Sequence, residues 1–187
     1  MDLERIINGI YPLPVESLAV FKACFEEKHY LKGALLYKQN TRATAIYFVK
    51  EGLVRAFARR GKKQITFWIG FDGELAFPIQ SVFSGAEEYA GIELLEDSTI
   101  YEISLARLQE LYMTDIHIAN WGRKYAEYAC IVAEKLFISR QFRTSLERYN
   151  DLLEQCPEIV RRVPLGIIAS YLGITQVNLS RIRALVR

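Results

Sequence analysis

The apolar residues of the chain change their spacing once, near residue 104, and this change limits the fold more than any other feature. Residues 30–104 contain short apolar runs of period 2, such as Ile65, Phe67 and Ile69, separated by turns that contain glycine. Residues 105–187 instead repeat apolar side chains at spacings of 3 and 4. Period 2 is typical of strands, and the 3–4 spacing is typical of helices. The sequence therefore predicts an α+β chain in which an antiparallel roll or sandwich precedes a helical half.

Turn signals separate the expected strands. Lys50-Glu51-Gly52 lies between the apolar residues 46–49 and 53–57, and Gly52 can adopt the positive φ of a tight turn. Further turns are expected at residues 59–62 and 96–98. Before the roll, residues 13–24 are expected to form a short helix with Pro14 near its first turn.

Three helices are expected after the roll, over residues 105–113, 116–140 and 144–155. The long middle helix carries an apolar seam with successive spacings of 3, 4, 3 and 4, formed by Ile118, Trp121, Tyr125, Tyr128 and Val132. This spacing is that of a coiled coil, so the seam predicts a homodimer. The alternative is a helix that packs against its own roll.

Residues 165–183 carry the most specific local pattern. Residues 165–172 form an amphipathic segment, Gly173 follows where a turn needs positive φ, and Thr175 is placed to cap a second helix. The small residue Ala169 allows the two helices to cross closely. The shared core is expected to consist of Ile168, Leu172, Ile174, Leu179 and Ile182. This arrangement predicts a helix-turn-helix.

The second helix of this motif exposes side chains that suit the DNA major groove. Gln and Asn pair with adenine, Arg pairs with guanine, and a valine methyl contacts thymine. The residues expected to contact DNA are Thr175, Gln176, Val177, Asn178, Ser180, Arg181 and Arg183. Residues 164–187 contain three arginines and no acidic residue, whereas the whole chain has a net charge of only +2. Positive charge is thus concentrated where phosphate binding requires it. The alternative is a helical hairpin that does not bind DNA.

The scarcity of histidine and cysteine argues against an enzyme or a metal site. A metal-dependent enzyme on a cupin-like roll needs two or three converging histidines and a carboxylate, whereas His29 and His117 stand alone. The three cysteines are far apart and are expected to be buried free thiols, which predicts a cytoplasmic protein. No signal peptide is visible, and no apolar run is long enough to cross a membrane.

The whole chain resembles transcription regulators of the cyclic-AMP receptor protein/FNR (Crp/Fnr) type. The resemblance rests on residues 71–75 (Phe-Asp-Gly-Glu-Leu), residues 168–174 and residues 179–183. It implies a jelly-roll, cyclic-nucleotide-binding-like sensor, a long dimerisation helix and a C-terminal helix-turn-helix of the winged-helix type. It also implies that Gln176, Val177, Ser180 and Arg181 read base edges, with Arg181 on a guanine.

The expected effector pocket departs from this family. Nucleotide-binding members follow Gly-Glu-Leu with an arginine and a hydroxyl residue that hold the cyclic phosphate. Here Gly73, Glu74 and Leu75 are present, but Glu88 and Tyr89 stand where the arginine and the hydroxyl belong. A glutamate repels the phosphate, so we expect no binding of cyclic AMP. The stretch near residues 132–134 also lacks the hydroxyls that contact the purine.

The resemblance implies no other cofactor. Iron–sulfur members carry an N-terminal cysteine cluster and haem members carry axial ligands, whereas Cys24 has no cysteine neighbour here. The chain ends at Arg187, so no wing hairpin is expected after the second helix.

The expected domains are a sensor roll (1–114), a dimerisation helix (115–140) and a DNA-binding domain (141–187). The expected partners are double-stranded DNA and a second copy of the chain. The organisation also allows contacts with RNA polymerase and with an unidentified small-molecule effector. The alternative function is a signalling module whose helix-turn-helix binds a protein instead of DNA.

Overall fold

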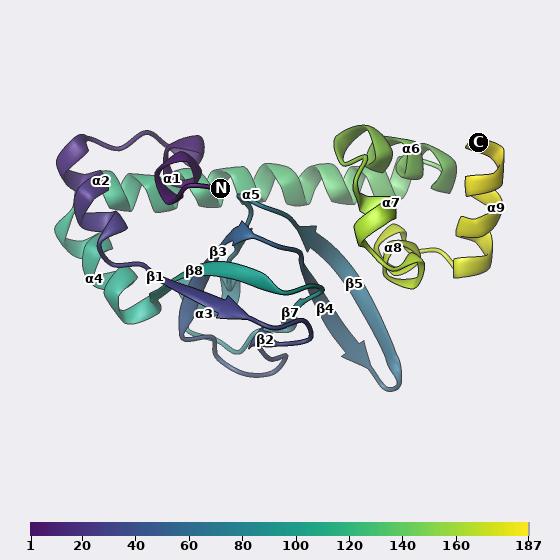
Figure 1. Cartoon of the computed structure of the whole chain (residues 1–187). Helices are drawn as coiled ribbons and strands as arrows, with labels where there is room; N and C mark the ends of the chain where they lie inside the picture. The colour runs from purple at the N-terminus through teal and green to yellow at the C-terminus, as the bar shows by residue number, and fades with distance from the viewer. Residues whose placement is uncertain (187) are drawn as a thin grey trace.

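A computed structural model of the chain describes residues 1–186 (Figure 1). Its first half is an antiparallel roll of two four-stranded sheets. The first sheet has the order β1 (Glu26–Tyr30), β8 (Ser98–Ser104), β3 (Ala45–Glu51) and β6 (Leu75–Ala76). The second has the order β2 (Leu35–Tyr37), β7 (Gly91–Leu94), β4 (Val54–Arg60) and β5 (Lys63–Gly70). The predicted α+β roll is confirmed.

Glycines close the predicted turns of this roll. Gly52 has φ +135° between β3 and β4, and a β-carbon there would overlap the side chain of Ser98. Gly61 has φ +61° at the tip of the β4–β5 hairpin. Side chains other than glycine rarely adopt these angles, so both turns depend on the residue type.

The six helices that the sequence predicts begin near the expected residues, and three further helices, α1, α3 and α7, are also present in the described residues. Those outside the C-terminal domain are α1 (Leu3–Ile10), α2 (Val15–Lys22), α3 (Ile79–Ser84), α4 (Leu105–Thr114) and α5 (Ile116–Phe142). The C-terminal domain contains α6 (Ser145–Gln155), α7 (Ile159–Arg162), α8 (Leu165–Leu172) and α9 (Gln176–Val186). Thr144 and Glu147 form a capping box at the start of α6, which satisfies two backbone N–H groups. No helix in the described part of the chain is long and apolar enough to cross a membrane.

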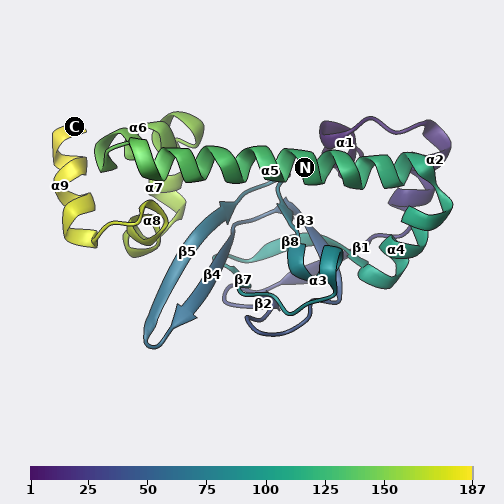
Figure 2. The same ribbon diagram turned by 180° about the vertical axis from the view of Figure 1, so that it is seen from behind.

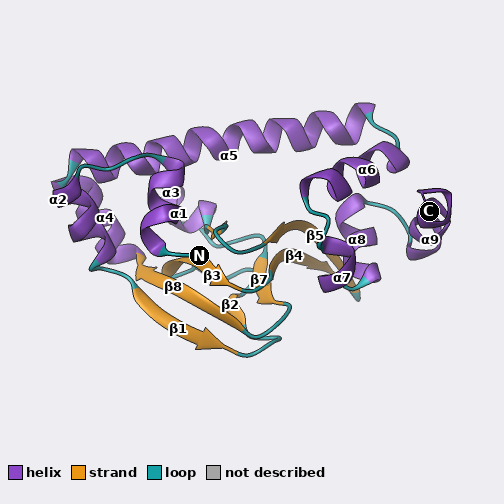
Figure 3. Cartoon of the chain, turned by 45° about the horizontal axis from the view of Figure 1, so that its top comes forward, coloured by secondary structure: helices purple, strands orange, loops and turns teal. Residues whose placement is uncertain are grey.

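The long helix α5 lies across the roll and runs from the side of α2 and α4 to the α6–α9 helices (Figures 1 and 2). Helices α1, α2 and α4 pack around its N-terminal half, and its C-terminal half leads to the α6–α9 domain (Figure 3). The side chains of Ile118 and Trp121 are 0% exposed, and Trp121 Nε1 donates a hydrogen bond to the Ile7 carbonyl at 2.9 Å. These two residues therefore belong to the core of their own chain.

The prediction that Ile118 and Trp121 lie in a dimer interface is wrong. The 3–4 spacing identifies an apolar face of the helix, but it does not identify what covers that face. Here α1, together with Phe21 of α2 and Phe48 of β3, covers this face. The remaining seam residues, Tyr125, Tyr128 and Val132, line a cavity beneath the same helix. The alternative, a helix packed against its own roll, describes this face of α5.

The cysteines also differ from the prediction. Cys130 is exposed on α5, and Cys24 and Cys156 are half-buried. All three are free thiols, as predicted, but none is fully buried.

Candidate DNA-binding surface and effector cavity

Helices α8 and α9 form the predicted helix-turn-helix. Gly173 has φ +71° after α8, and the Ile174 N–H donates to the Ala169 carbonyl at 2.9 Å, which closes the turn. The Thr175 hydroxyl accepts a hydrogen bond from the Asn178 N–H at 3.2 Å, so the predicted N-cap is confirmed. The five residues expected in the shared core pack together in one cluster, in which Leu179 is 0% exposed. Burial of this inner face fixes which side of α9 faces water.

The outer face of α9 is free of contacts that would block a duplex. The residues expected to contact DNA that are exposed are Thr175, Gln176, Val177, Asn178, Ser180 and Arg181. Arg183, the remaining member of the set, is half-buried. The helix thus presents amide, guanidinium and apolar groups on one accessible surface.

Arg162, just upstream of the motif, binds the roll and is not free to contact a phosphate. Arg162 pairs with Glu96 on the roll, and its guanidinium also donates to the Gly52 carbonyl at 3.1 Å. The bond to Glu96 raises the pKa of Arg162. Arg162 therefore joins the two halves of the chain, and the sequence gives no signal of this role. Arg161 pairs with Glu158 on the surface.

A cavity of about 710 Å³ lies between the roll and α5. It brings together all five residues expected in the effector pocket: Gly73, Glu74, Leu75, Glu88 and Tyr89. Val132 and Ala133 of α5 line it too, in the stretch expected to face a purine. Cavities of this volume hold small organic molecules in other proteins.

The charge on the wall of this cavity is mainly negative. The Glu88 side chain belongs to a residue that is 4% exposed, and its Oε1 accepts a hydrogen bond from the Ser81 N–H at 2.6 Å. Burial raises the pKa of Glu74. Within residues 1–186, neither carboxylate forms an ion pair with a lysine or arginine. A phosphate placed here would meet uncompensated anions.

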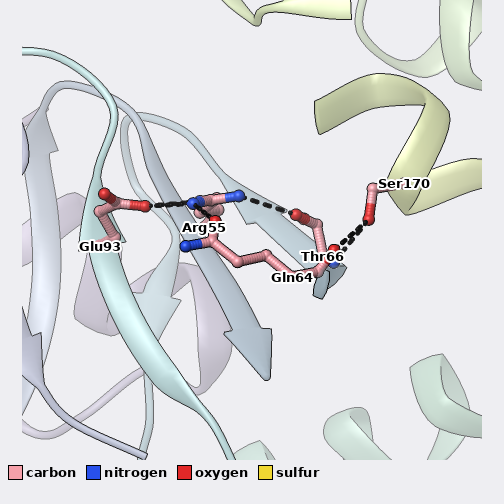
Figure 4. Close-up of polar contacts among 5 residues, drawn as sticks. All are labelled: Arg55, Gln64, Thr66, Glu93 and Ser170. Atoms are coloured by element: carbon pink, nitrogen blue, oxygen red, sulfur yellow. Dashed lines mark hydrogen bonds and ion pairs between the residues drawn. The ribbon is translucent and has the colours of Figure 1, made fainter. Parts of the chain in front are cut away.

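A chain of polar contacts connects the roll to α8 (Figure 4). Arg55 is 7% exposed, and it donates to Glu93 at 2.7 Å, to the Gln64 side chain at 2.6 Å and to the Thr66 hydroxyl at 3.3 Å. The backbone N–H of Thr66 then donates to the Ser170 hydroxyl at 2.9 Å, and that hydroxyl donates to the Gln64 carbonyl at 3.4 Å. Helix α8 therefore binds the free edge of β5. Two neighbouring β5 residues, Phe67 and Trp68, line the cavity.

Comparisons with known proteins agree with this architecture. Residues 27–115 match the family described as the cyclic nucleotide-binding domain. None of the curated proteins compared with the chain matches it.

Solved structures resemble nearly the whole chain. FixK2 from Bradyrhizobium japonicum superimposes with a TM-score of 0.72 at 20% identity, covering 87% of this chain and 84% of FixK2. A putative Crp/Fnr-family regulator from Eubacterium rectale gives 0.73 at 16% identity, covering 95% and 87%. The catabolite activator protein of Thermus thermophilus gives 0.60 at 18% identity, covering 95% and 85%.

The superimposed regions extend over the roll, the long helix and the C-terminal helices, which follow one another in the same order along the chains. Residues 27–115 match the cyclic nucleotide-binding domain family, and the chain as a whole has the fold of these solved Crp/Fnr-type structures.

Proposed function

We propose that this protein is a homodimeric transcription regulator that binds double-stranded DNA through α9. The observation that carries the proposal is the exposed outer face of α9, on which Gln176, Asn178 and Arg181 are free to enter a major groove. These side-chain types form the bidentate contacts that distinguish adenine and guanine. The resemblance in fold to named regulators supports the same function.

An exposed stripe of α5 that borders the cavity at Tyr128 supports a dimer along another seam. Its exposed residues repeat the spacing 3, 4, 3 and 4 at Tyr128, Ile131, Lys135, Ile138 and Phe142. Ile131 is 51% exposed and Phe142 is 83% exposed, so this stripe has no cover in the single chain. A coiled coil along it would bury these side chains, and a lysine at one core position is a known means of setting register. We propose this stripe in place of the seam that contains Trp121.

A dimer of this kind places two recognition helices on one face of a duplex, about one helical turn apart, so the operator should be an inverted repeat. Selection of bound duplexes from a random pool tests symmetry and specificity together. Fluorescence anisotropy at several salt concentrations then measures affinity. If no duplex binds in a salt-dependent manner, the helix-turn-helix serves a protein contact instead.

The sensor half is proposed to respond to an effector other than cyclic AMP. The resemblance implies that Glu88 stands where a phosphate-binding arginine would be, and Glu88 is buried at the cavity wall. Calorimetry should detect no micromolar binding of cyclic AMP or cyclic GMP. The double variant Glu88→Arg with Tyr89→Ser tests whether these two positions exclude the nucleotide, because binding should then appear.

The effector is proposed to change the orientation of the DNA-binding domain. The connection between α5 and α6 passes through Arg143 and Thr144, which have extended backbone and form no part of a helix. A shift in population between two dimer states at this hinge would alter DNA affinity.

A further inference from the structure

The cavity beneath α5 differs from an anion site both in charge and in the nature of its walls. Aromatic rings form much of its lining: Tyr37, Phe67, Trp68, Phe77, Tyr89 and Tyr125. Several of these rings contact one another, as Phe67 does with Tyr89 at a centroid distance of 5.5 Å and Phe77 with Tyr125 at 4.5 Å. The faces of such rings carry partial negative charge and attract cations.

Glu88 adds a carboxyl group to these walls. It is more than nine-tenths buried, and the bond from Ser81 fixes one of its carboxylate oxygens. Tyr37 and Tyr89 line the same cavity as Glu88. Burial raises the pKa of both phenols, and the nearby Glu88 raises both further. A buried carboxylate without a counter-ion is costly, so this site favours a positively charged partner.

Glu74 reinforces the same field from the side of α5. Burial raises the pKa of Tyr125 and of Tyr128, and the negative charge of Glu74 contributes to both shifts. Arg5 is the only basic side chain among the described lining residues, and it is an exposed residue of α1. Asp72 also lines the cavity, with its Oδ1 accepting from the Gly52 N–H at 2.8 Å. The lining therefore holds three carboxylates and one guanidinium, together with Met1, whose terminal ammonium donates to the Lys50 carbonyl.

We propose that the effector cavity binds an organic cation, namely a protonated amine on an aromatic or aliphatic body. The ammonium group would pair with Glu88 and Glu74, and the apolar body would pack against the rings. The volume of about 710 Å³ suits a molecule of this class, larger than a free metal ion. The inference deepens the sensor role proposed above and rests on it.

A matched series of three probes tests the charge of the ligand. We would titrate 4-phenylbutylamine, 4-phenylbutanol and 4-phenylbutyrate into the full chain by calorimetry, in the absence of DNA. The amine should bind at least about tenfold more tightly than the butyrate, with the alcohol between them. Trp68 lines the cavity whereas Trp121 is buried elsewhere, so a change in tryptophan emission in the wild type that Trp68→Phe removes locates the binding.

Two variants test whether the carboxylates of Glu88 and Glu74 pair with the ammonium group. Glu88→Gln and Glu74→Gln should each weaken the amine about fivefold or more and leave the alcohol unchanged, because glutamine keeps the shape and loses the charge. Glu87→Gln is the matched control, since Glu87 is exposed and does not line the cavity. Retained binding of the alcohol shows that a variant is folded.

The proposal is overturned if the amine does not bind, if the butyrate binds equally well, or if Glu87→Gln weakens the amine as much as Glu88→Gln. DNA selection is carried out separately and without these probes. Failure of the amine to bind therefore leaves the proposed DNA-binding function intact, and failure to bind DNA leaves the cavity result intact.

Discussion

Replacement of Ser170 by alanine should loosen the DNA-binding domain from the roll. The Ser170 hydroxyl accepts the hydrogen bond from the Thr66 N–H, and Thr66 is 0% exposed. In Ser170→Ala this buried N–H has no acceptor unless the two halves separate enough to admit water. An unsatisfied buried donor costs about 1–3 kcal/mol, which corresponds to a change of about 5- to 150-fold in the docking equilibrium.

Amide hydrogen exchange of Thr66 measures this equilibrium directly. Its N–H points from the edge of β5 to α8, so protection from exchange reports how often α8 leaves the strand. The exchange rate of the Thr66 amide should rise by the factor above in Ser170→Ala. The amide of Ile100, in the other sheet, should keep its rate.

Ser145→Ala is the matched control, because within residues 1–186 the Ser145 side chain forms no hydrogen bond to β5. An unchanged Thr66 exchange rate in Ser170→Ala, or an equal increase in Ser145→Ala, would refute the claim that this contact holds the domain in place.

Four further predictions follow from individual residues. Arg181→Ala should relax base choice at one position in each half-site at a cost of about 1–3 kcal/mol, measured by anisotropy on a panel of duplexes, and an equal loss on every sequence would show phosphate contact only. Ile138→Glu should convert a dimer to a monomer in sedimentation, whereas Ile116→Glu, at an exposed site of α5 outside the proposed stripe, should not. Thr144→Ala should reduce the free energy of unfolding by about 1 kcal/mol in a urea titration, since it removes the cap of α6. Because burial raises the pKa of Glu74, this carboxyl takes up a proton at a higher pH than an exposed glutamate does; 4-phenylbutylamine should therefore bind more weakly as the pH is lowered, and Glu74→Gln should flatten this dependence.

The helix-turn-helix could be predicted almost to the residue because its signals are local. Gly173 at positive φ, the small residue Ala169 four positions before it and the Thr175 cap two positions after it define the motif. An apolar pattern over 19 residues completes it. The pocket residues could also be placed, since the roll folds Gly73 and Glu88 onto one cavity as the resemblance implies.

The distant parts of the chain that cover the apolar face of α5 could not be predicted from the sequence. Trp121 has the spacing of an interface residue, but α1, Phe21 of α2 and Phe48 of β3 fill the space around it. The β4–β5 ladder gives a second example: a register shift between Ala56 and Phe57 leaves Thr66 at 0% exposure and Ile65 at 37%, against simple alternation. The short elements β2, α3 and α7 were also not anticipated, because three to six residues are too few for a period to show.

The docking of α8 on β5 also protects this protein against aggregation through a strand edge. β5 is the last strand of its sheet, and an uncovered strand edge offers hydrogen bonds to any passing chain. While α8 occupies that edge, the Thr66 N–H is hydrogen-bonded to Ser170 and is not available to pair with a strand of another chain. Any state in which the DNA-binding domain swings away opens the edge, and only the charged hairpin end, with Arg60 and Lys63, then discourages pairing. If the α6–α9 domain moves away from the roll, the edge of β5 becomes free to pair with a strand of another molecule. A bound ligand that holds the domain in one place would reduce the time that this edge is free.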